Sequence, residues 1–262
     1  MDPAAILGFA IGIGAILLAI FLEGASPASV LLPSPIILVF VGTFGVTLIG
    51  GTLKDCITAL KALPKVFTGK PSNPAASVDT IVSLAEQARR EGLLALEDAA
   101  KDIDNEFLRG GLRAAIDGTD PDDLRELLED QIAAKRTADH VGYKFYEDMG
   151  GYAPTIGIVG TVVSLVHVLE NLAEPSELGH MIAAAFLATF WGIASANVFW
   201  LPIGNRLKRL SVLECEQMEI ITEGLLAVQS GANPRAVSER LRSLIPVTSI
   251  PGKDVGAKAD QT

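Results

Sequence analysis

The chain has 262 residues, of which 49% are apolar and 20% are charged, and its mean hydropathy is +0.39. A soluble domain of this length carries about 25% charged residues, so charge is missing from part of the sequence. The net charge of -10 and the lack of a continuous basic patch exclude a nucleic-acid-binding protein, and the apolar content excludes a disordered chain. A disulfide scaffold is excluded too, because there are only two cysteines.

Four long blocks of the sequence contain no Asp, Glu, Lys or Arg. Each block reaches the roughly 20 residues that a helix needs to cross a hydrocarbon core of about 30 Å. The turn-rich stretch SPASVLLPSP lies early in the second block, so the second helix is expected to begin after it. The sequence therefore predicts an integral membrane protein with spans over residues 4–22, 36–53, 151–169 and 181–203. The first span lacks the basic flank of a signal peptide and exceeds its usual apolar length, so we expect it to be retained.

The positive charges predict the orientation of these spans, because Lys and Arg beside a span resist transfer across the membrane. All 21 basic residues fall in two segments, 13 over residues 54–144 and 8 over residues 206–258. The connections over residues 23–35 and 170–178 contain none. We therefore expect both termini to be cytoplasmic and only two short loops to face outward.

The predicted fold is an all-α membrane protein with four transmembrane helices, a helical cytoplasmic domain between the second and third, and a helical cytoplasmic tail. No segment is predicted to form a strand. The expected parts are a transmembrane hairpin over residues 1–53, a cytoplasmic helical domain over 54–148, a second transmembrane hairpin over 149–205, a cytoplasmic helical tail over 206–250 and a disordered end over 251–262.

Within the cytoplasmic segments, apolar residues recur every three or four positions, as on one face of a helix. Ser77 is expected to cap one helix, and Gly92 to interrupt it. Pro121, followed by two aspartates, is expected to open a helix that runs on towards the third span. Pro234 is expected to open the last helix.

No motif of a common enzyme occurs in the sequence. It has no Walker P-loop, no GxSxG and no HExxH, and its three histidines lack metal-ligand spacing. Cys56 and Cys215 lie far apart in segments expected to face a reducing compartment, so no disulfide is predicted. We predict no enzymatic activity, no cofactor and no metal site.

The third and fourth spans each carry a stripe of small and polar side chains at helical spacing. The stripes are Pro154, Gly157, Thr161, Ser164 and Val168 in the third span, and Ala185, Thr189, Gly192 and Ala196 in the fourth. Small residues let membrane helices pack closely, and a threonine can bond its own helix backbone, so both stripes have a structural explanation. The alternative is that the hydroxyls face a polar path and that Pro154 and Pro202 act as hinges.

The chain resembles the MotA/PomA family, the peptidoglycan-unanchored subunit of the bacterial flagellar motor stator. Three segments carry the resemblance, which are ARREGLLALE, GGYAPTIGIVGTVVSLVHVLENL and ELGHMIAAAFLATFWGIASANVFWLPIGNRLKRL. The layout is similar as well, with a short hairpin, a large cytoplasmic insertion and two more spans. The resemblance covers nearly the whole chain except the last dozen residues.

This resemblance implies a homopentamer of the chain around a dimer of a MotB/PomB-like partner, a single-span protein that binds peptidoglycan. The complex would lie in the bacterial cytoplasmic (inner) membrane, conduct H+ or Na+ inward and turn against a FliG-like rotor protein. By the same resemblance, Pro154 and Pro202 match two prolines tied to coupling. Arg89 and Glu97 match the charged pair that engages the rotor, with Arg90 as the alternative to Arg89.

Thr161 and Thr189 match family positions close to the ion path, but the chain alone is not expected to conduct ions. An ion crossing a membrane needs an intermediate ionisable group, and the four spans contain no Asp, Glu, Lys or Arg. Glu170 and His167 are expected near the outer interface. We therefore expect the titrating carboxylate to come from a partner helix placed against the hydroxyls of Thr161, Ser164 and Thr189.

Two other functions are left open by the sequence. An ExbB/TolQ-like energy-transducing subunit has three spans, so the predicted span over residues 4–22 favours the stator. A membrane scaffold without ion traffic is distinguished only by measuring ion flux with and without a partner.

Overall fold

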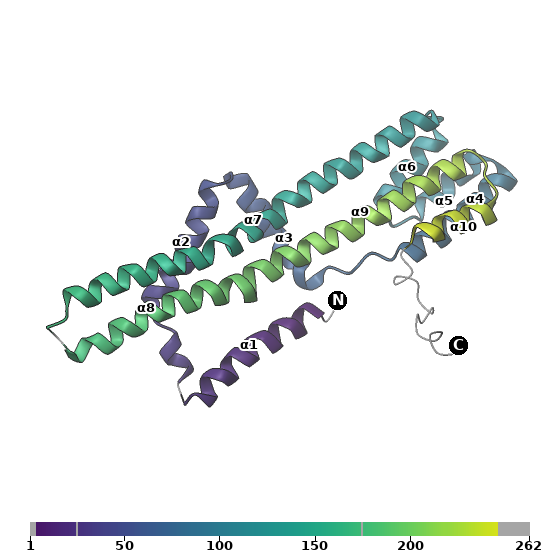
Figure 1. Ribbon diagram of the computed structural model, residues 1–262. Helices are drawn as coiled ribbons and strands as arrows, with labels where there is room; N and C mark the ends of the chain where they lie inside the picture. Colours follow the sequence, from purple (N-terminus) through teal and green to yellow (C-terminus); the bar gives the residue numbers. More distant parts are fainter. Residues whose placement is uncertain (1–3, 25, 174, 246–262) are drawn as a thin grey trace, which may run out of the picture. The chain divides into compact units, whose positions relative to one another are not determined.

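The computed structural model describes residues 4–24, 26–173 and 175–245, and each regular element in these ranges is helical (Figure 1). The elements are α1 (Ala4–Leu22), η1 (Pro27–Val30), α2 (Pro33–Ile49), α3 (Leu53–Thr68), α4 (Pro74–Glu91), η2 (Leu93–Ala95), α5 (Leu96–Lys101), α6 (Glu106–Ile116), α7 (Pro121–Glu170), α8 (Pro175–Ser195), the π turn η3 (Ala196–Trp200), α9 (Leu201–Gln229) and α10 (Pro234–Leu244). No strand occurs in the described ranges, which agrees with the all-α prediction.

In the part of the chain that the structure describes, three stretches of helix are long and apolar enough to cross a membrane, and the shorter α2 is apolar too. The three are α1, part of α7, and part of the continuous helical run Leu178–Gln229, which passes from α8 through η3 into α9. Large apolar side chains on these helices are exposed in the single chain, with Ile11 and Phe21 of α1 each 71% exposed. Apolar surface of this extent needs lipid or another protein to cover it.

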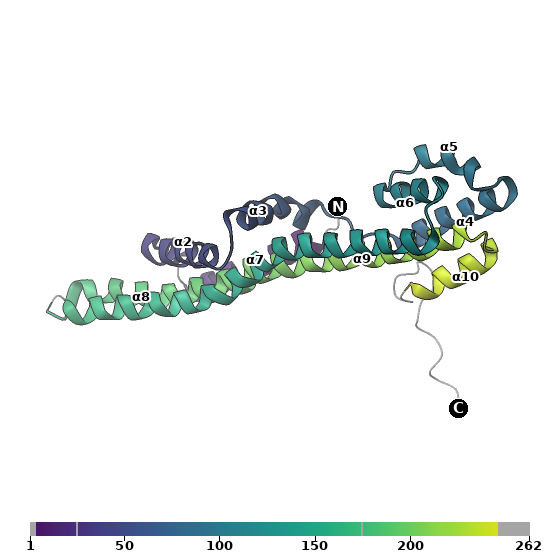
Figure 2. The ribbon, with the colours of Figure 1, turned by 90° about the horizontal axis from the view of Figure 1, so that it is seen from above.

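The chain divides into two compact units, of which the first comprises residues 1–70 and 138–210. In this unit α7 and α8 lie side by side as an antiparallel hairpin (Figures 1 and 2). α2 packs against α8 and buries a face of residues four apart, namely Pro35, Val39, Thr43 and Thr47. A further apolar cluster joins α3 to α7 and α9 through Cys56, Ala59, Val66, Phe145, Tyr146, Met149, Ile203 and Leu207.

The second unit comprises residues 71–137 and 211–262 and contains the remaining parts of α7 and α9. Figure 2 shows α4, α5, α6 and α10 grouped around these parts. Its core includes Ile81, Leu112, Leu124, Leu128, Ile221, Leu225 and Leu241. Across the two long helices, Arg136 pairs with Glu219 at 2.9 Å and Lys135 pairs with Glu214 at 2.7 Å.

The helix in the second predicted span begins earlier and ends earlier than the sequence suggested. It runs over Pro33–Ile49, and the predicted end at residue 53 is wrong. Thr52 starts a new helix there, because its hydroxyl accepts from the Asp55 amide while its own amide donates to the Asp55 carboxylate at 2.8 Å. This reciprocal cap separates α2 from the amphipathic α3.

The predicted cap at Ser77 is also wrong. α4 begins at Pro74, and the side chain of Asn73 accepts from the Ala76 amide. Ser77 is buried instead, where its hydroxyl accepts from the Gln217 amide nitrogen at 2.6 Å. Both residues are good caps, and the proline at the first helical position decides between them.

Three other boundary predictions, each for a single helix end, are confirmed. α4 ends before Gly92, whose φ is +85°, and helices begin at Pro121 and Pro234. Cys56 and Cys215 are both buried free thiols, as expected without a disulfide. The end predicted to be disordered, residues 251–262, lies outside the described residues.

Candidate functional site

α7 and α8 approach each other closely along a seam of small residues. A methyl group added at Gly157 would lie 2.7 Å from the Ala188 carbonyl oxygen, and one at Gly192 would lie 2.8 Å from the Ala153 carbonyl oxygen. Neither position has room for a larger residue unless the helices separate. The glycines of both stripes therefore pack the two backbones together, as small residues do in membrane helix pairs.

The hydroxyl groups of Thr161 and Thr189 meet inside this seam. Their oxygen atoms lie 2.5 Å apart. The Thr161 oxygen also lies 3.0 Å from the Ala185 carbonyl oxygen of α8 and 3.1 Å from the Gly157 carbonyl oxygen of its own helix. A hydroxyl has one proton, so when Thr161 donates to a carbonyl, Thr189 donates to Thr161. The two predicted residues thus form one small polar network between the helices.

The stripe on α7 also contains Ser164, Val168 and Pro154, which do not join this network. Ser164 is half-buried about one turn beyond Thr161, and Val168 is buried. Pro154 is half-buried, and α7 continues through it without interruption. The structure therefore brings together the two threonines and leaves Ser164 and Pro154 at other levels of the same helix.

Pro202 follows a π turn that the sequence analysis did not predict. Within η3 the helix widens, and the Leu201 amide donates to the carbonyl of Ala196, five residues back. Pro202 has no amide proton, and its ring crowds the carbonyl four residues earlier, so a widened turn relieves the crowding. Pro202 itself was the only sequence signal for this irregularity.

The residues matched to the rotor contact lie in the second unit. Arg89 and Arg90 are exposed in the last turn of α4, and Glu97 is exposed in the first turn of α5. They are not on one continuous helix, because Gly92 and the turn η2 separate α4 from α5. The Gln87 amide nitrogen donates to the Ala95 carbonyl at 3.2 Å and fixes this turn. The structure keeps all three charges on the surface at a rigid corner.

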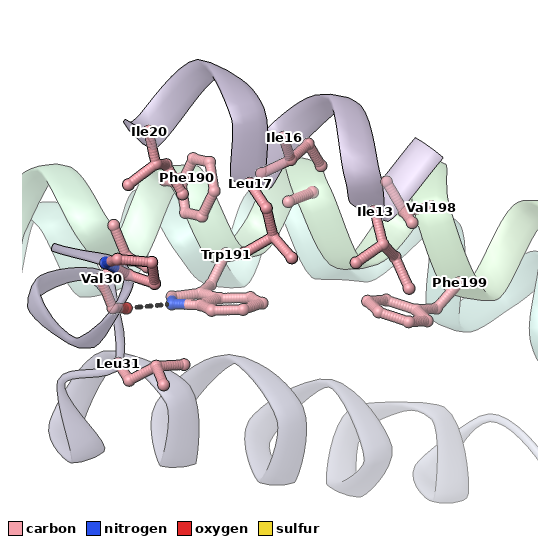
Figure 3. A pocket seen from close by; sticks show the side chains of 12 residues that line it. Ile13, Ile16, Leu17, Ile20, Val30, Leu31, Phe190, Trp191, Val198 and Phe199 are labelled. Carbon is pink, nitrogen blue, oxygen red and sulfur yellow. Dashed lines mark hydrogen bonds between the residues drawn. The ribbon is translucent and has the colours of Figure 1, made fainter. Parts of the chain in front are cut away.

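An apolar cavity of roughly 130 Å³ opens between α1, η1 and the α8–η3 stretch (Figure 3). The Trp191 indole nitrogen donates to the Val30 carbonyl at 2.7 Å and ties η1 to α8. Ile13, Leu17 and Phe199 contribute to its apolar lining (Figure 3). Sequence patterns gave no indication of this cavity, because its lining comes from three separate segments. Its lining offers hydrocarbon surface and no reactive group.

The polar groups of the described residues do not assemble into a metal site, since no group of three or more His, Cys, Asp or Glu side chains is placed to hold a metal ion there. The spans over residues 151–169 and 181–203 contain no acidic residue at all. The seam therefore presents hydroxyl and carbonyl oxygens but no carboxylate of its own.

Comparison with other sequences gives extensive similarity to motility proteins. The family model described as the MotA/TolQ/ExbB proton channel family matches residues 99–220. Motility protein A of Bacillus subtilis is 32% identical, over 94% of this chain and 92% of its own length. Chemotaxis protein PomA of Vibrio alginolyticus is also 32% identical, over 94% of this chain and 96% of its own length.

Solved structures give the same result for the fold. MotAB from C. jejuni has a TM-score of 0.90 and 29% identity, covering 97% of this chain and 100% of that chain. The flagellar MotAB stator complex from Bacillus subtilis has a TM-score of 0.86 and 31% identity, covering 93% and 96%. These similarities extend over both apolar hairpins and the helical insertion between them. The chain therefore belongs to the motility protein A family of flagellar stator subunits.

Proposed function

We propose that this chain forms, with a MotB/PomB-like single-span partner, an ion-driven complex that generates torque on the flagellar rotor. The observation that carries the proposal is the Thr161–Thr189 hydroxyl pair in the glycine seam of α7 and α8. The pair lies near the middle of two apolar spans without acidic residues. It can bond a carboxylate or an ion but needs the carboxylate from another chain.

The proposed complex lies in the bacterial cytoplasmic membrane, with four spans per chain and both termini in the cytoplasm. The distribution of all 21 basic residues supports this orientation. A homopentamer around a partner dimer is proposed from the family resemblance, and the solved relatives are MotAB complexes. The two transmembrane hairpins, the cytoplasmic domain and the tail, with the boundaries given above, are part of the same proposal. The transported ion is H+ or Na+, and no cofactor or enzymatic step is involved.

A carboxylate on the partner helix is the proposed titrating group. While it is ionised, it accepts a hydrogen bond from the Thr189 hydroxyl, and Thr161 donates to the Ala185 or Gly157 carbonyl. When an incoming ion neutralises the carboxylate, the hydrogen bond from Thr189 to the carboxylate weakens. The Thr189 hydroxyl then donates to Thr161 instead. Ser164, about one turn away on α7, is the proposed second hydroxyl along the path.

Coupling to the cytoplasmic part is proposed to run through Pro154 and Pro202. The π turn can change its hydrogen bonding, because the Leu201 amide, which donates to the carbonyl five residues back at Ala196, can instead donate to the carbonyl four residues back, as in an α-helix. A small displacement of α8 at Thr189 can then pass into α9 as a change of register. One charge crossing 100 mV releases about 2.3 kcal/mol, which exceeds a typical net hydrogen-bond contribution of about 1 kcal/mol.

Contact with a FliG-like rotor protein is proposed at the corner that carries Arg89, Arg90 and Glu97. Their exposure and the rigid turn between α4 and α5 support a docking role. Exposed ion pairs contribute about 0 to 1 kcal/mol each, so we expect these charges to affect the rate and the orientation of binding to the rotor protein more than the affinity.

Driven ion flux in liposomes tests the proposal. We expect no flux from this chain alone and flux from the complex with a partner from which the segment that plugs the channel has been removed. Flux should be lost when the titrating carboxylate of the partner helix, expected to be an Asp, is changed to Asn. Thr189→Val is expected to reduce the flux at least about tenfold and Thr189→Ser to retain most of it, because only the second keeps a hydroxyl. Thr155→Val is the matched control, since Thr155 is exposed on α7 and bonds only the Tyr152 carbonyl. Selective flux from the chain alone, or full flux after the Asp-to-Asn change, would refute the proposal.

A further inference from the structure

One side of α3 is anchored to the first unit. Cys56, Ala59 and Val66 are buried in the cluster that this helix shares with α7 and α9. The hydroxyl of Tyr146 donates to the Ala59 carbonyl oxygen at 2.9 Å and is itself buried. These contacts fix the rotation of α3 about its axis, so they determine which of its side chains face outward.

The outward side of α3 carries a second apolar stripe. Leu53, Ile57 and Leu60 are spaced four and three residues apart and therefore lie on one face. Their side chains are 74%, 52% and 52% exposed. A helix that packs only against protein buries such a stripe, and this helix leaves it bare beside the face that packs through Cys56, Ala59 and Val66.

Two exposed lysines border this stripe. At about 100° per residue, Lys54 and Lys61 project roughly a quarter turn away from Leu53, Ile57 and Leu60. The acidic residue of the helix, Asp55, projects to the opposite side and is engaged in the cap with Thr52. The exposed side of α3 is therefore apolar next to its packed face and basic farther round the helix, where Lys54 and Lys61 lie.

α3 also begins where an apolar helix ends. α2 stops at Ile49, whose side chain is 85% exposed, and Leu53 follows after a short turn. In Figure 1, α3 runs across the line of the neighbouring part of α7 instead of along it. If α2 spans the membrane, α3 lies along the membrane surface at its cytoplasmic end.

We propose that α3 is an interfacial helix that binds anionic phospholipid, with Leu53, Ile57 and Leu60 among the acyl chains and Lys54 and Lys61 on the headgroup phosphates. Long basic side chains beside an apolar stripe reach the headgroup level, and each attracts anionic lipid. The positive charge of the two lysines favours anionic lipid, and a neighbouring copy of the proposed homopentamer that covers the stripe is the other outcome of the test. The proposal goes beyond torque generation and needs only that α2 crosses the membrane.

The test uses the complex with its partner in nanodiscs, with a fluorophore attached to Leu60→Cys. The parent chain, whose two cysteines are buried, gives the labelling background. Brominated acyl chains quench a fluorophore that lies among them, and they are supplied either on phosphatidylglycerol or on phosphatidylcholine at equal mole fraction. We expect quenching by both and about twofold more by the brominated phosphatidylglycerol.

Two charge variants then test the lysines. Lys54→Gln with Lys61→Gln is expected to abolish the preference for phosphatidylglycerol and to keep the quenching. The matched control, Lys101→Gln with Arg113→Gln, removes the same charge from exposed residues of the second unit and is expected to keep the preference. Equal quenching by the two lipids in the parent complex would overturn the headgroup assignment. No quenching by either lipid would overturn the whole proposal and indicate that protein or water faces the stripe.

Discussion

At the scale of single residues, glycines decide how close α7 and α8 come. Gly157→Ala places a methyl group 2.7 Å from the Ala188 carbonyl oxygen and 3.0 Å from the Gly192 Cα, so the two helices must separate. We expect this overpacking to destabilise the complex by about 1–3 kcal/mol, measured as the detergent-induced unfolding midpoint. The matched control is Gly151→Ala, because Gly151 lies on the same helix with open space around its Cα. Equal stability of the two variants would contradict the close packing.

Tyr146 makes a second residue-scale prediction, which concerns pH. Burial raises the pKa of Tyr146 from 10.0 to about 12. Between these values the unfolded chain loses the phenol proton and the folded chain keeps it, so the free energy of unfolding falls by about 1.4 kcal/mol per pH unit as the pH rises from 10 to 12. Below pH 10 this group contributes no pH dependence.

Unfolding midpoints across this alkaline range check the effect. Tyr146→Phe is expected to lose about 1 kcal/mol at neutral pH, because the bond to the Ala59 carbonyl is gone, and to lose the part of the alkaline slope that Tyr146 contributes. Tyr143→Phe is the control and is expected to keep the slope, since it leaves that bond in place. An equal slope in Tyr146→Phe and in the parent chain would show that Tyr146 does not contribute to it.

Residue-scale prediction from sequence found the threonines but not their contact. Spacing along each helix placed Thr161 and Thr189 on small, polar stripes. Their 2.5 Å approach depends on the register of the α7–α8 pair, which the close contacts at Gly157 and Gly192 fix and which neither helix specifies alone. A stripe shows which face of one helix is small and polar. The contacts across that face also depend on the position of the neighbouring helix.

At the scale of elements, the π turn before Pro202 is the feature to which we assign the coupling role. Pro202→Ala restores an amide and removes the crowding ring, so we expect η3 to close into a regular α-helix. The complex is then expected to assemble normally and to lose most of its torque, measured on tethered cells beside the amount of complex in the membrane. Pro121→Ala is the control, because Pro121 lies at the first position of α7. Torque that falls only in proportion to assembly would favour a purely structural role for Pro202.

Helices with a long apolar periodicity were predicted well from the sequence. Helices whose residues are explained by tertiary packing were predicted poorly. The sequence anticipated α7 from Pro121 into the third span, and also α10, because apolar spacing and N-terminal prolines agree there. It did not anticipate α6, whose sequence contains Gly110 and Gly111. A methyl group at Gly111 would lie 2.5 Å from Leu225 Cδ1, so this glycine is explained by a tertiary contact that no local pattern reveals.

At the scale of the whole molecule, the rotor contact is a prediction about charge. Arg89→Glu is expected to impair swimming without affecting membrane insertion, and a reversed charge on the rotor protein is expected to restore part of it. Arg113→Glu is the control, since it reverses an exposed charge on α6. Normal swimming in both Arg89→Glu and Glu97→Lys would contradict the proposal that this corner contacts the rotor protein.

The central claim is that this chain turns ion flow into rotation, and torque measures it most directly. The chain and its single-span partner are produced in flagellated cells that lack all stator subunits, and a bead on the flagellum reports the torque. We predict that rotation begins on production of both proteins, stops when the H+ and Na+ gradients are collapsed, and fails when either protein is left out. Rotation that persists without either gradient, or no rotation from a complex that assembles and conducts ions, would contradict the claim.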